Sequence, residues 1–473
     1  MDAVILWFRQ DLRLADNPAW KKAVESGRPV VPVYIWSPEE AGAWAPGGAS
    51  RWWLHHALKD LAGQLEEADS RLILMQGDSS EALKDLVSET GAGAVYWNRC
   101  YEPCRVRLDG RLKQELKESG IEAWSGNSAL LKEPWEISTQ QGNPYKVFTP
   151  FSKNFAGKQL HDPVETDGKP EAPPAWPEGE ELEALGLLPE IPWDEGLQNF
   201  WDPTRAGGFE RLETFLSDGM ESYHENRDYP AVDGTSRMSP YLHFGQVGPR
   251  EAYWRLARHR SGKGRETFLN ELVWREFAYH VLYHFPDTPE EPLQLKYARF
   301  PWQRNESQLR AWQQGRTGYP IVDAGMRQLW QTGWMHNRVR MIVASLLVKH
   351  LLQSWEEGAR WFWDTLVDAD LASNTLGWQW AGGCGADAAP YFRIFNPITQ
   401  GEKFDPEGTY IRKYVPELGK VPLKYLHQPW EMPGPVQESS GCVIGEDYPE
   451  PVIEHAKGRE RALKALESIK EGD

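Results

Sequence analysis

The run DADLASNTLGWQW, residues 368 to 380, brings together the side chains best suited to hold a polar aromatic ligand. Asp368 and Asp370 stand two residues apart, and an amide follows at Asn374. Carboxylates and amides orient a bound molecule through hydrogen bonds. The simpler alternative is a structural loop in which the acids cap the next helix. Arg340 is the ion-pair partner we expect for Asp368.

Two tryptophans, Trp378 and Trp380, flank a glutamine at the end of this run. Indole rings can cover the flat faces of a ligand. In an extended segment the two rings would face the same side, whereas in a helix they would point about 200° apart. The helical alternative predicts that each tryptophan serves a different neighbour.

The segment FLNELVWRE predicts a helix with an unusual mixed face. Phe268, Glu271, Trp274 and Arg275 recur at i, i+3, i+6 and i+7 and therefore share one side. A buried face would be aliphatic, and a solvated one would lack the aromatic rings. The mixture favours the wall of a cavity that contacts a flat polar ligand.

The segment DGTSRMSPYL favours an anion site. Thr235, Ser236 and Ser239 supply hydroxyls, Arg237 supplies charge, and Pro240 suits the first turn of a helix. Free N–H groups at a helix start bind phosphate. An ordinary capped helix is the alternative.

The segment GWMHNRVRM is basic in an otherwise acidic chain. It contains His336, Asn337, Arg338, Arg340 and Met341. No acid occurs from residue 327 to residue 349. Positive charge beside aromatic residues is typical of proteins that bind a phosphodiester strand, and a solvated helix face is the alternative.

The rest of the sequence contains no Ser/His/Asp or Cys/His arrangement, so we expect a cofactor to carry the chemistry. No metal is expected, because Cys100 and Cys104 have no accompanying ligand cluster. The net charge of −17 over 473 residues argues against a protein that coats nucleic acid nonspecifically. Without a signal peptide or an apolar run of transmembrane length, we expect a cytoplasmic protein, acting as a monomer.

The chain must position these groups with two kinds of domain. Apolar runs at 3–8, 29–36, 71–77 and 94–99 alternate with helical stretches. They predict a doubly wound, parallel-sheet (Rossmann-like) α/β domain over residues 1–130, without a GxGxxG dinucleotide motif. Residues 131–205 are rich in Pro, Gly and acid and predict an interdomain linker. Residues 206–473 carry apolar stripes of period 3.6 and predict an all-α domain.

In these motifs the sequence resembles the cryptochrome/photolyase family, and within it the class I type of cyclobutane pyrimidine dimer (CPD) DNA photolyases. The resemblance covers nearly the whole chain, from WFRQDLRLADNPA near the start to GEKFDPEGTYIRKYVPEL near the end. It implies an antenna chromophore in the α/β domain and FAD in the helical domain. The implied activity is light-driven repair of dimers in UV-damaged DNA, in which excited reduced FAD passes an electron to the flipped-out dimer.

The resemblance also implies residue roles. The FAD contacts are Tyr223, Thr235, Ser236, Arg237, Met238, Ser239, Phe268, Arg275, Asn337, Arg340, Asp368, Asp370 and Asn374. Asn374 faces flavin N5. The residues at the mouth of the lesion pocket are Arg227, Glu271, Trp274, Arg275, Asn337, Arg338, Met341 and Trp380. Trp378, Trp355 and Trp302 match a chain that photoreduces the flavin, and Glu271 would stabilise the dimer after electron transfer.

Three rival functions remain as alternatives at this point, and the identity of the antenna chromophore is open. A cryptochrome photoreceptor shares the fold and FAD, but plant-type members carry an acid where Asn374 stands. A (6-4) photolyase of the animal branch has a second histidine in place of Asn337. A plain flavin oxidoreductase lacks support, since nothing here binds a nicotinamide. The antenna is unassigned: Cys104-Arg105 replaces the Asn-Glu pair of folate-binding members, which disfavours methenyltetrahydrofolate and leaves a deazaflavin, another flavin or none.

Overall fold

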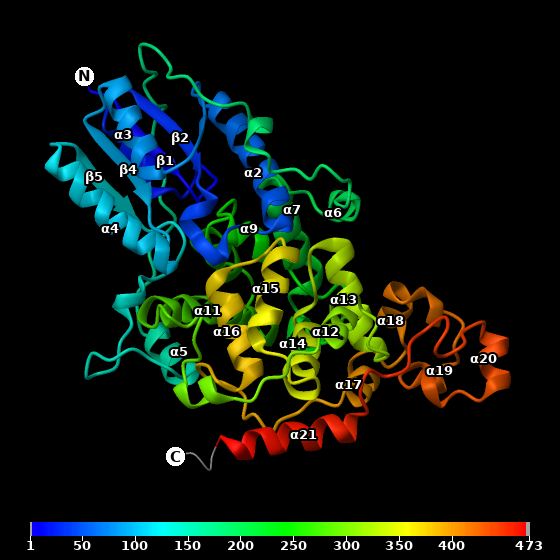
Figure 1. The fold of residues 1–473 in the computed structure, drawn as a ribbon. Coiled ribbons are helices and arrows are strands. Elements are labelled where there is room, and N and C mark those ends of the chain that lie inside the picture. The colour runs from blue at the N-terminus through cyan, green and yellow to red at the C-terminus, as the bar shows by residue number, and fades with distance from the viewer. Residues whose placement is uncertain (1, 470–473) are drawn as a thin grey trace.

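A computed structural model describes residues 2–469, and its N-terminal part is the expected doubly wound domain (Figure 1). The described residues form one parallel sheet in the order β3-β2-β1-β4-β5. The strands are β1 (Val4–Phe8), β2 (Val30–Trp36), β3 (Ile73–Gln76), β4 (Ala94–Asn98) and β5 (Glu122–Gly126). β5 was not among the predicted strands, because this edge strand, EAWSG, is only partly buried and lacks a continuous apolar run.

Helices cover both faces of the sheet, which explains why its strands are apolar throughout. They are α1 (Pro18–Glu25), α2 (Gly48–Glu67), α3 (Ser79–Thr90) and α4 (Pro103–Glu118). Alternate residues of β1 divide between the faces: Leu6 packs with α1 and α2, and Trp7 packs with α3 and α4. The carboxyl ends of the strands face the helical domain, since Trp7 of β1 and Trp36 of β2 line one cavity with His243 of the helical domain.

The linker region contacts both domains. It contains α5 (Phe148–Ala156) and α6 (Glu195–Phe200). In Figure 1 it passes α11, returns to the far end of the sheet and then descends to α6. Glu276 of α11 fastens its start by accepting backbone hydrogen bonds from Leu131 and Lys132, at 2.9 and 3.1 Å.

The remaining described residues are helical, as expected. The helices are α7 (Arg205–Thr214), α8 (Tyr223–Asn226), α9 (Ser239–His243), α10 (Pro249–Ala257), α11 (Lys263–His284), α12 (Glu306–Gln313), α13 (Pro320–Thr332), α14 (Asn337–Ser345), α15 (Trp355–Thr365), α16 (Leu371–Gly382), α17 (Pro397–Phe404), α18 (Thr409–Tyr414), α19 (Leu423–Leu426), α20 (Gly434–Ser440) and α21 (His455–Ser468). The apolar pattern at 322–355 is split because Gly333, with φ of 64°, ends α13 in the left-handed region.

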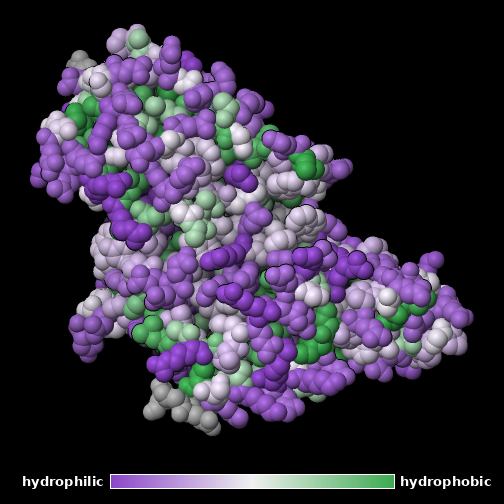
Figure 2. All heavy atoms as spheres, viewed as in Figure 1, coloured by the Kyte–Doolittle hydropathy of each residue, from purple (hydrophilic) through white to green (hydrophobic). Residues whose placement is uncertain are grey.

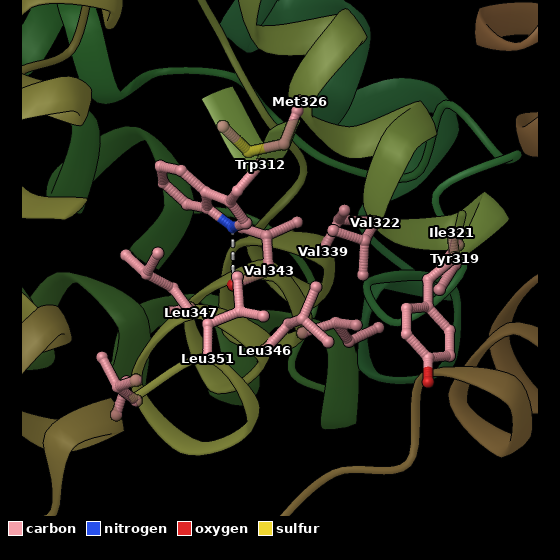
Figure 3. Packing of buried hydrophobic residues seen from close by; sticks show 14 of the residues in the cluster. Trp312, Tyr319, Ile321, Val322, Met326, Val339, Val343, Leu346, Leu347 and Leu351 are labelled. Atoms are coloured by element: carbon pink, nitrogen blue, oxygen red, sulfur yellow. Dashed lines mark hydrogen bonds between the residues drawn. The ribbon is translucent and has the colours of Figure 1, made fainter. Parts of the chain in front are cut away.

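The core of the helical domain surrounds Trp312, whose indole N–H donates to the carbonyl of Val343 at 3.0 Å (Figure 3). A second apolar cluster runs from β1 and α2 into the helical domain, so the two domains share part of their core. The face of the molecule shown in Figure 2 is mostly hydrophilic. Within residues 2–469, no helix has the length and apolarity needed to cross a membrane.

A buried arginine fastens the loop after β1 to the helical domain. Arg13 is fully buried and donates to the carbonyl of Gly245 at 2.7 Å. Asp16 accepts from Arg250 of α10 at 2.9 Å. Gly245 has φ of 69°, and a Cβ there would lie 2.2 Å from the carbonyl of Gln10. The WFRQDLRLADNPA motif thus has a structural role in docking the domains.

Candidate active site

The two acids of the opening motif stand at the start of α16 and have different partners. Asp368 accepts two hydrogen bonds from Arg340, at 3.0 and 2.8 Å, and one from the Ser239 hydroxyl at 2.6 Å. The predicted Arg340 pair is confirmed. Asp370 caps α16 by accepting from the backbone N–H of Ser373 at 2.7 Å, so the capping alternative is also correct for this acid.

Asp370 is also the centre of a buried polar cluster. The Tyr279 hydroxyl donates to it, and His243 Nδ1 lies 3.5 Å from its carboxylate. Burial alone would raise the pKa of Asp370, but His243, Arg275 and the Tyr279 hydroxyl lower it below the usual value. Asp370 is therefore a fixed negative charge.

The loop before α9 has the donors expected of an anion site. Arg237 adopts a φ of 51° and pairs with Asp233 at 2.8 Å. Burial, together with Arg211, lowers the pKa of Arg237 to about 10. Its guanidinium lies 5.4 Å from the ring of Trp334, which in turn contacts the His336 ring.

Arg237 Nε and His336 Nε2 are among the buried donors that have no hydrogen-bond partner within residues 2–469. His336 Nδ1 accepts the N–H of Arg338 at 3.2 Å, so the ring proton resides on Nε2. Burial lowers the pKa of His336 to about 4, which keeps the ring neutral. Unpaired buried donors beside a guanidinium suit a phosphate-bearing ligand.

The mixed face of α11 is confirmed as helical, but its members divide among several environments. Phe268 is buried 5.3 Å from the ring of Tyr223. Glu271 forms an ion pair with Arg227 of the segment after α8. Trp274, half-buried, stacks on Phe148 with ring centroids 3.6 Å apart.

Arg275 points into the protein interior. Its guanidinium donates to the carbonyl of Ala129 at 2.7 Å and lies over the Tyr279 ring at 4.8 Å. Although burial alone would lower the pKa of Arg275, Tyr279 and Asp370 raise it. This placement puts Arg275 beside the Asp370 cluster, away from the half-open residues around Glu271.

The basic segment forms the start of α14, and its side chains point to different sides of that helix. Asn337 is exposed, and Arg338 donates to Asp228 at 2.7 Å and to the Met341 sulfur at 3.7 Å. Arg340 instead turns to Asp368. Because Arg338 and Arg340 are both paired with acids from other segments, the acid-free stretch carries less net charge than its sequence suggests.

Trp378 and Trp380 point to different sides, because α16 is helical. Trp378 is buried and fits against Gly358 of α15, where a Cβ would lie 2.0 Å from the indole. Trp380 is half-buried and continues the open side of α16 formed by Ser373 and Gly377. The helical alternative is thus the correct one.

Trp355 and Trp302 belong to the same apolar cluster as Trp378, with Trp302 at its partly buried edge. Trp355 is buried and Trp302 rests on Phe300, with ring centroids 4.4 Å apart. The rings around Trp378 are Phe362 at 5.0 Å and Trp312 at 6.1 Å. No role was predicted for Trp312, Tyr279 or His243, because nothing in their local sequence distinguishes them from core residues. Asn374 is buried and donates to the carbonyl of Ala359 at 3.0 Å.

A cavity lies where the carboxyl ends of the strands meet the helical domain. Its wall includes Trp7, Trp36, Trp44, Glu102, Arg105, His243 and Trp363. Gln10 donates to Glu102 at 2.9 Å, and Arg105 forms an ion pair with Glu40. Since His243 also contacts Asp370, this cavity and the acid cluster are neighbours. Within residues 2–469, no group of three His, Cys, Asp or Glu side chains could hold a metal ion.

Comparison with known proteins now relates this geometry to a family. A model described as the FAD binding domain of DNA photolyase matches residues 268–468, and one described as DNA photolyase matches residues 4–174. A deoxyribodipyrimidine photo-lyase of Agrobacterium fabrum is 48% identical, over 99% of this chain and 98% of that protein. The chain belongs to the DNA photolyase family. Cryptochrome-2 of Arabidopsis thaliana is 38% identical, over 99% of this chain and 79% of that protein.

A crystal structure of a bacterial class III photolyase from Agrobacterium tumefaciens has a TM-score of 0.96 to this photolyase-family chain. The two chains are 47% identical, and the match covers 100% of this chain and 98% of that one. The similarity establishes the photolyase fold but does not confirm the class I type expected from the sequence.

The helical part of this photolyase-family chain is an FAD-binding domain, and its residues fit that cofactor. FAD carries a diphosphate, which requires donors from the protein. Arg237 Nε and His336 Nε2, which have no hydrogen-bond partner within residues 2–469, are donors of the kind a diphosphate requires. These unpaired buried donors are a feature of the structure and are independent of the family match.

Proposed function

We propose that this chain repairs cyclobutane pyrimidine dimers in UV-damaged DNA in a light-dependent reaction, as a deoxyribodipyrimidine photo-lyase. One observation carries the proposal: two half-buried tryptophans, Trp274 and Trp380, stand on α11 and α16, which pack together, and the Glu271–Arg227 pair lies on the same side of α11 as Trp274. Aromatic rings beside a carboxylate–guanidinium pair suit an extrahelical dimer, which presents flat faces and polar edges.

These residues act on the dimer in different ways. The tryptophans stack on its rings, at roughly 1–3 kcal/mol per base. Glu271 hydrogen-bonds the base edge and stabilises charge that develops there, while Arg227 holds its carboxylate in position. Asn337, Arg338 and Met341 line the approach of the damaged strand. Because Arg338 is already paired with Asp228, DNA phosphate must compete for it.

On the cofactor side, FAD would be held by hydroxyl, guanidinium, carboxylate and aromatic groups. They are Tyr223, Thr235, Ser236, Arg237, Met238, Ser239, Phe268, Arg275, Asn337, Arg340, Asp368, Asp370 and Asn374. When bound, reduced and light-excited FAD would supply the electron that opens the cyclobutane ring and would take it back once the ring has split, so that the repair involves no net oxidation or reduction. Asn374 presents an uncharged amide, which adds no negative charge beside the reduced cofactor. Trp378, Trp355 and Trp302 would conduct electrons inward from the surface.

We propose a class III rather than a class I enzyme, on the similarity to the structure described as class III. The cavity that includes Trp7, Trp36 and Trp44 is the proposed antenna site, with the chromophore unassigned. We expect a cytoplasmic monomer, since one chain contains all the residues needed for one lesion. A cryptochrome photoreceptor is the second candidate, favoured by the 38% identity to Cryptochrome-2.

The decisive experiment is repair of a thymine-dimer oligonucleotide by the purified holoprotein under blue light, with a dark control. We expect thymines to be restored only in the light. If light restores no thymines while the flavin still photoreduces, the photoreceptor becomes the better assignment. An absorption spectrum of the same sample identifies the flavin and any second chromophore.

A further inference from the structure

An exposed apolar surface lies where α13 and α15 end, and it contains no residue of the proposed active site. We define the Trp330 surface by Ile191, Trp193, Trp330 and Trp361. Ile191 is 75% exposed, Trp330 60% and Trp193 40%, and Trp361 is half-buried. Figure 2 shows hydrophobic atoms reaching the surface in the region of α6, among hydrophilic ones. Burying such side chains on a partner releases them from water.

These residues come from distant parts of the sequence but form one continuous surface. The rings of Trp330 and Trp361 stack, with centroids 6.0 Å apart and an interplanar angle of 8°. One helical turn after Trp361, Asp364 accepts the backbone N–H of Gly48 at 2.9 Å. The Trp193 indole lies over Gly48, 3.2 Å from where a Cβ would stand.

The segment after Trp193 contacts the end of α13, beside Trp330. A Cβ on Gly196 would lie 1.9 Å from the carbonyl of Gln331, so this segment runs directly over the end of α13 beside Trp330. Contacts of this kind fix the linker in place, and the exposed rings are therefore part of a defined surface rather than of a loose loop.

Acidic side chains surround the Trp330 surface. The exposed acids are Glu190, Glu195, Glu357 and Asp364. Arg360, on the same side of α15, and Arg51, one turn after Gly48 on α2, are also exposed and offset two of these four charges. The surface is therefore apolar at its centre and negative at its rim, which disfavours nucleic acid. A second copy of the chain is also disfavoured, since it would bring the same acids and a net charge of −17 to the contact.

We propose that the Trp330 surface docks a basic amphipathic helix of a partner protein. A helix of this type lays an apolar face on the tryptophans and places Lys or Arg side chains against the acidic rim. The proposal does not depend on DNA repair, since none of its residues belongs to the proposed active site.

A synthetic amphipathic helical peptide of Leu and Lys is the probe, and the same peptide with Glu for Lys is its control. Binding to the holoprotein is followed by fluorescence anisotropy of a labelled peptide. We expect the Lys peptide to bind and Trp330→Ser to weaken it about tenfold or more, as for an aromatic hot spot. Trp135→Ser is the matched control, because Trp135 is 47% exposed elsewhere on the molecule, and it should leave binding unchanged. Glu190→Gln with Glu195→Gln should weaken binding and reduce its salt dependence.

Several results would overturn the proposal: equal binding of the Glu peptide, equal weakening by Trp135→Ser, or full affinity in Trp330→Ser. Sedimentation velocity supplies a further test, since a concentration-dependent dimer abolished by Trp330→Ser would replace the partner by a second copy. Photorepair of Trp330→Ser should equal that of the parent, which shows that the variant is folded. If the parent protein shows no repair, the proposed enzyme function fails but the docking proposal does not. Retained flavin absorbance then serves as the evidence that Trp330→Ser is folded.

Discussion

The cofactor side and the lesion side of the proposed active site differ in how the fold supports them. On the cofactor side, Asp368 and Asp370 are both less than 9% exposed and are fixed by several hydrogen bonds. On the lesion side, the side chains of Arg227 and Glu271 are 23% and 31% exposed and rely mainly on each other. A permanent ligand becomes part of the core, whereas a transient one needs an open, adjustable surface. The two sides should therefore respond differently to mutation.

The largest effect is expected for Asp368→Ala. It removes the carboxylate that accepts three hydrogen bonds from Arg340 and Ser239, and a hydrogen bond to a charged group contributes about 1.5–3 kcal/mol. We expect lost flavin absorbance and a lower midpoint of chemical unfolding. Asp218→Ala, at an exposed acid outside the site, is the control. Retention of full flavin content and stability in Asp368→Ala would show that the cofactor side is less interdependent than its bonds suggest.

The next effect concerns Glu276, five residues from Glu271 on the same helix but fully buried. Burial raises the pKa of Glu276 to about 7, against the opposing effects of Arg275 and two backbone N–H donors. A carboxyl whose folded-state pKa is raised binds a proton more tightly in the folded protein, so stability falls as pH rises from about 4.5 to 7. The shift corresponds to up to about 3 kcal/mol.

Glu276→Gln should abolish that contribution to the pH dependence, even though the amide loses one hydrogen bond to the linker. The measurement is the free energy of unfolding at pH 5, 6, 7 and 8 in both proteins. Identical slopes for Glu276→Gln and the parent would mean that Glu276 is ionised throughout this range.

On the lesion side, Glu271→Ala should lower repair about tenfold to hundredfold while FAD stays bound, since it removes one electrostatic contact to the reacting base. Repair yield and flavin absorbance are measured on the same sample. Glu266→Ala, at an exposed acid on the same helix, should repair normally. Loss of flavin from Glu271→Ala would move this residue to the cofactor side.

Trp302→Phe tests whether photoreduction of the flavin can be separated from repair of the dimer. The half-buried Trp302 belongs to the proposed electron-transfer chain but contacts neither the proposed FAD site nor the lesion site. The variant should therefore photoreduce its flavin several-fold more slowly. Chemically reduced Trp302→Phe should repair dimers at the parental rate, and Trp135→Phe should photoreduce normally. Unchanged photoreduction would direct attention to Trp312, whose ring lies 6.1 Å from Trp378.

Sequence patterns predicted the parts of this molecule that depend on local periodicity. The parallel sheet, the helical domain and the Asp368–Arg340 pair followed from apolar runs and charge complementarity. The partners of Asp370 did not, since Tyr279 and His243 are 91 and 127 residues away and lie in ordinary helical sequence. The acid-free stretch around Arg338 misled for the same reason: Asp228, its partner, is 110 residues away. Long-range pairing is set by packing, which the sequence alone does not display.

The smallest effect is expected for Arg338→Ala. DNA phosphate must displace Asp228 from Arg338, so the net gain from this contact is modest. Affinity for dimer-containing DNA should fall by a small factor, and the slope of log affinity against log salt should decrease by about 1, the value for one lost phosphate contact. Titrations at several salt concentrations measure both, with Arg71→Ala of the α/β domain as control. An unchanged slope would place Arg338 outside the DNA contact, and its ion pair with Asp228 would then be purely structural.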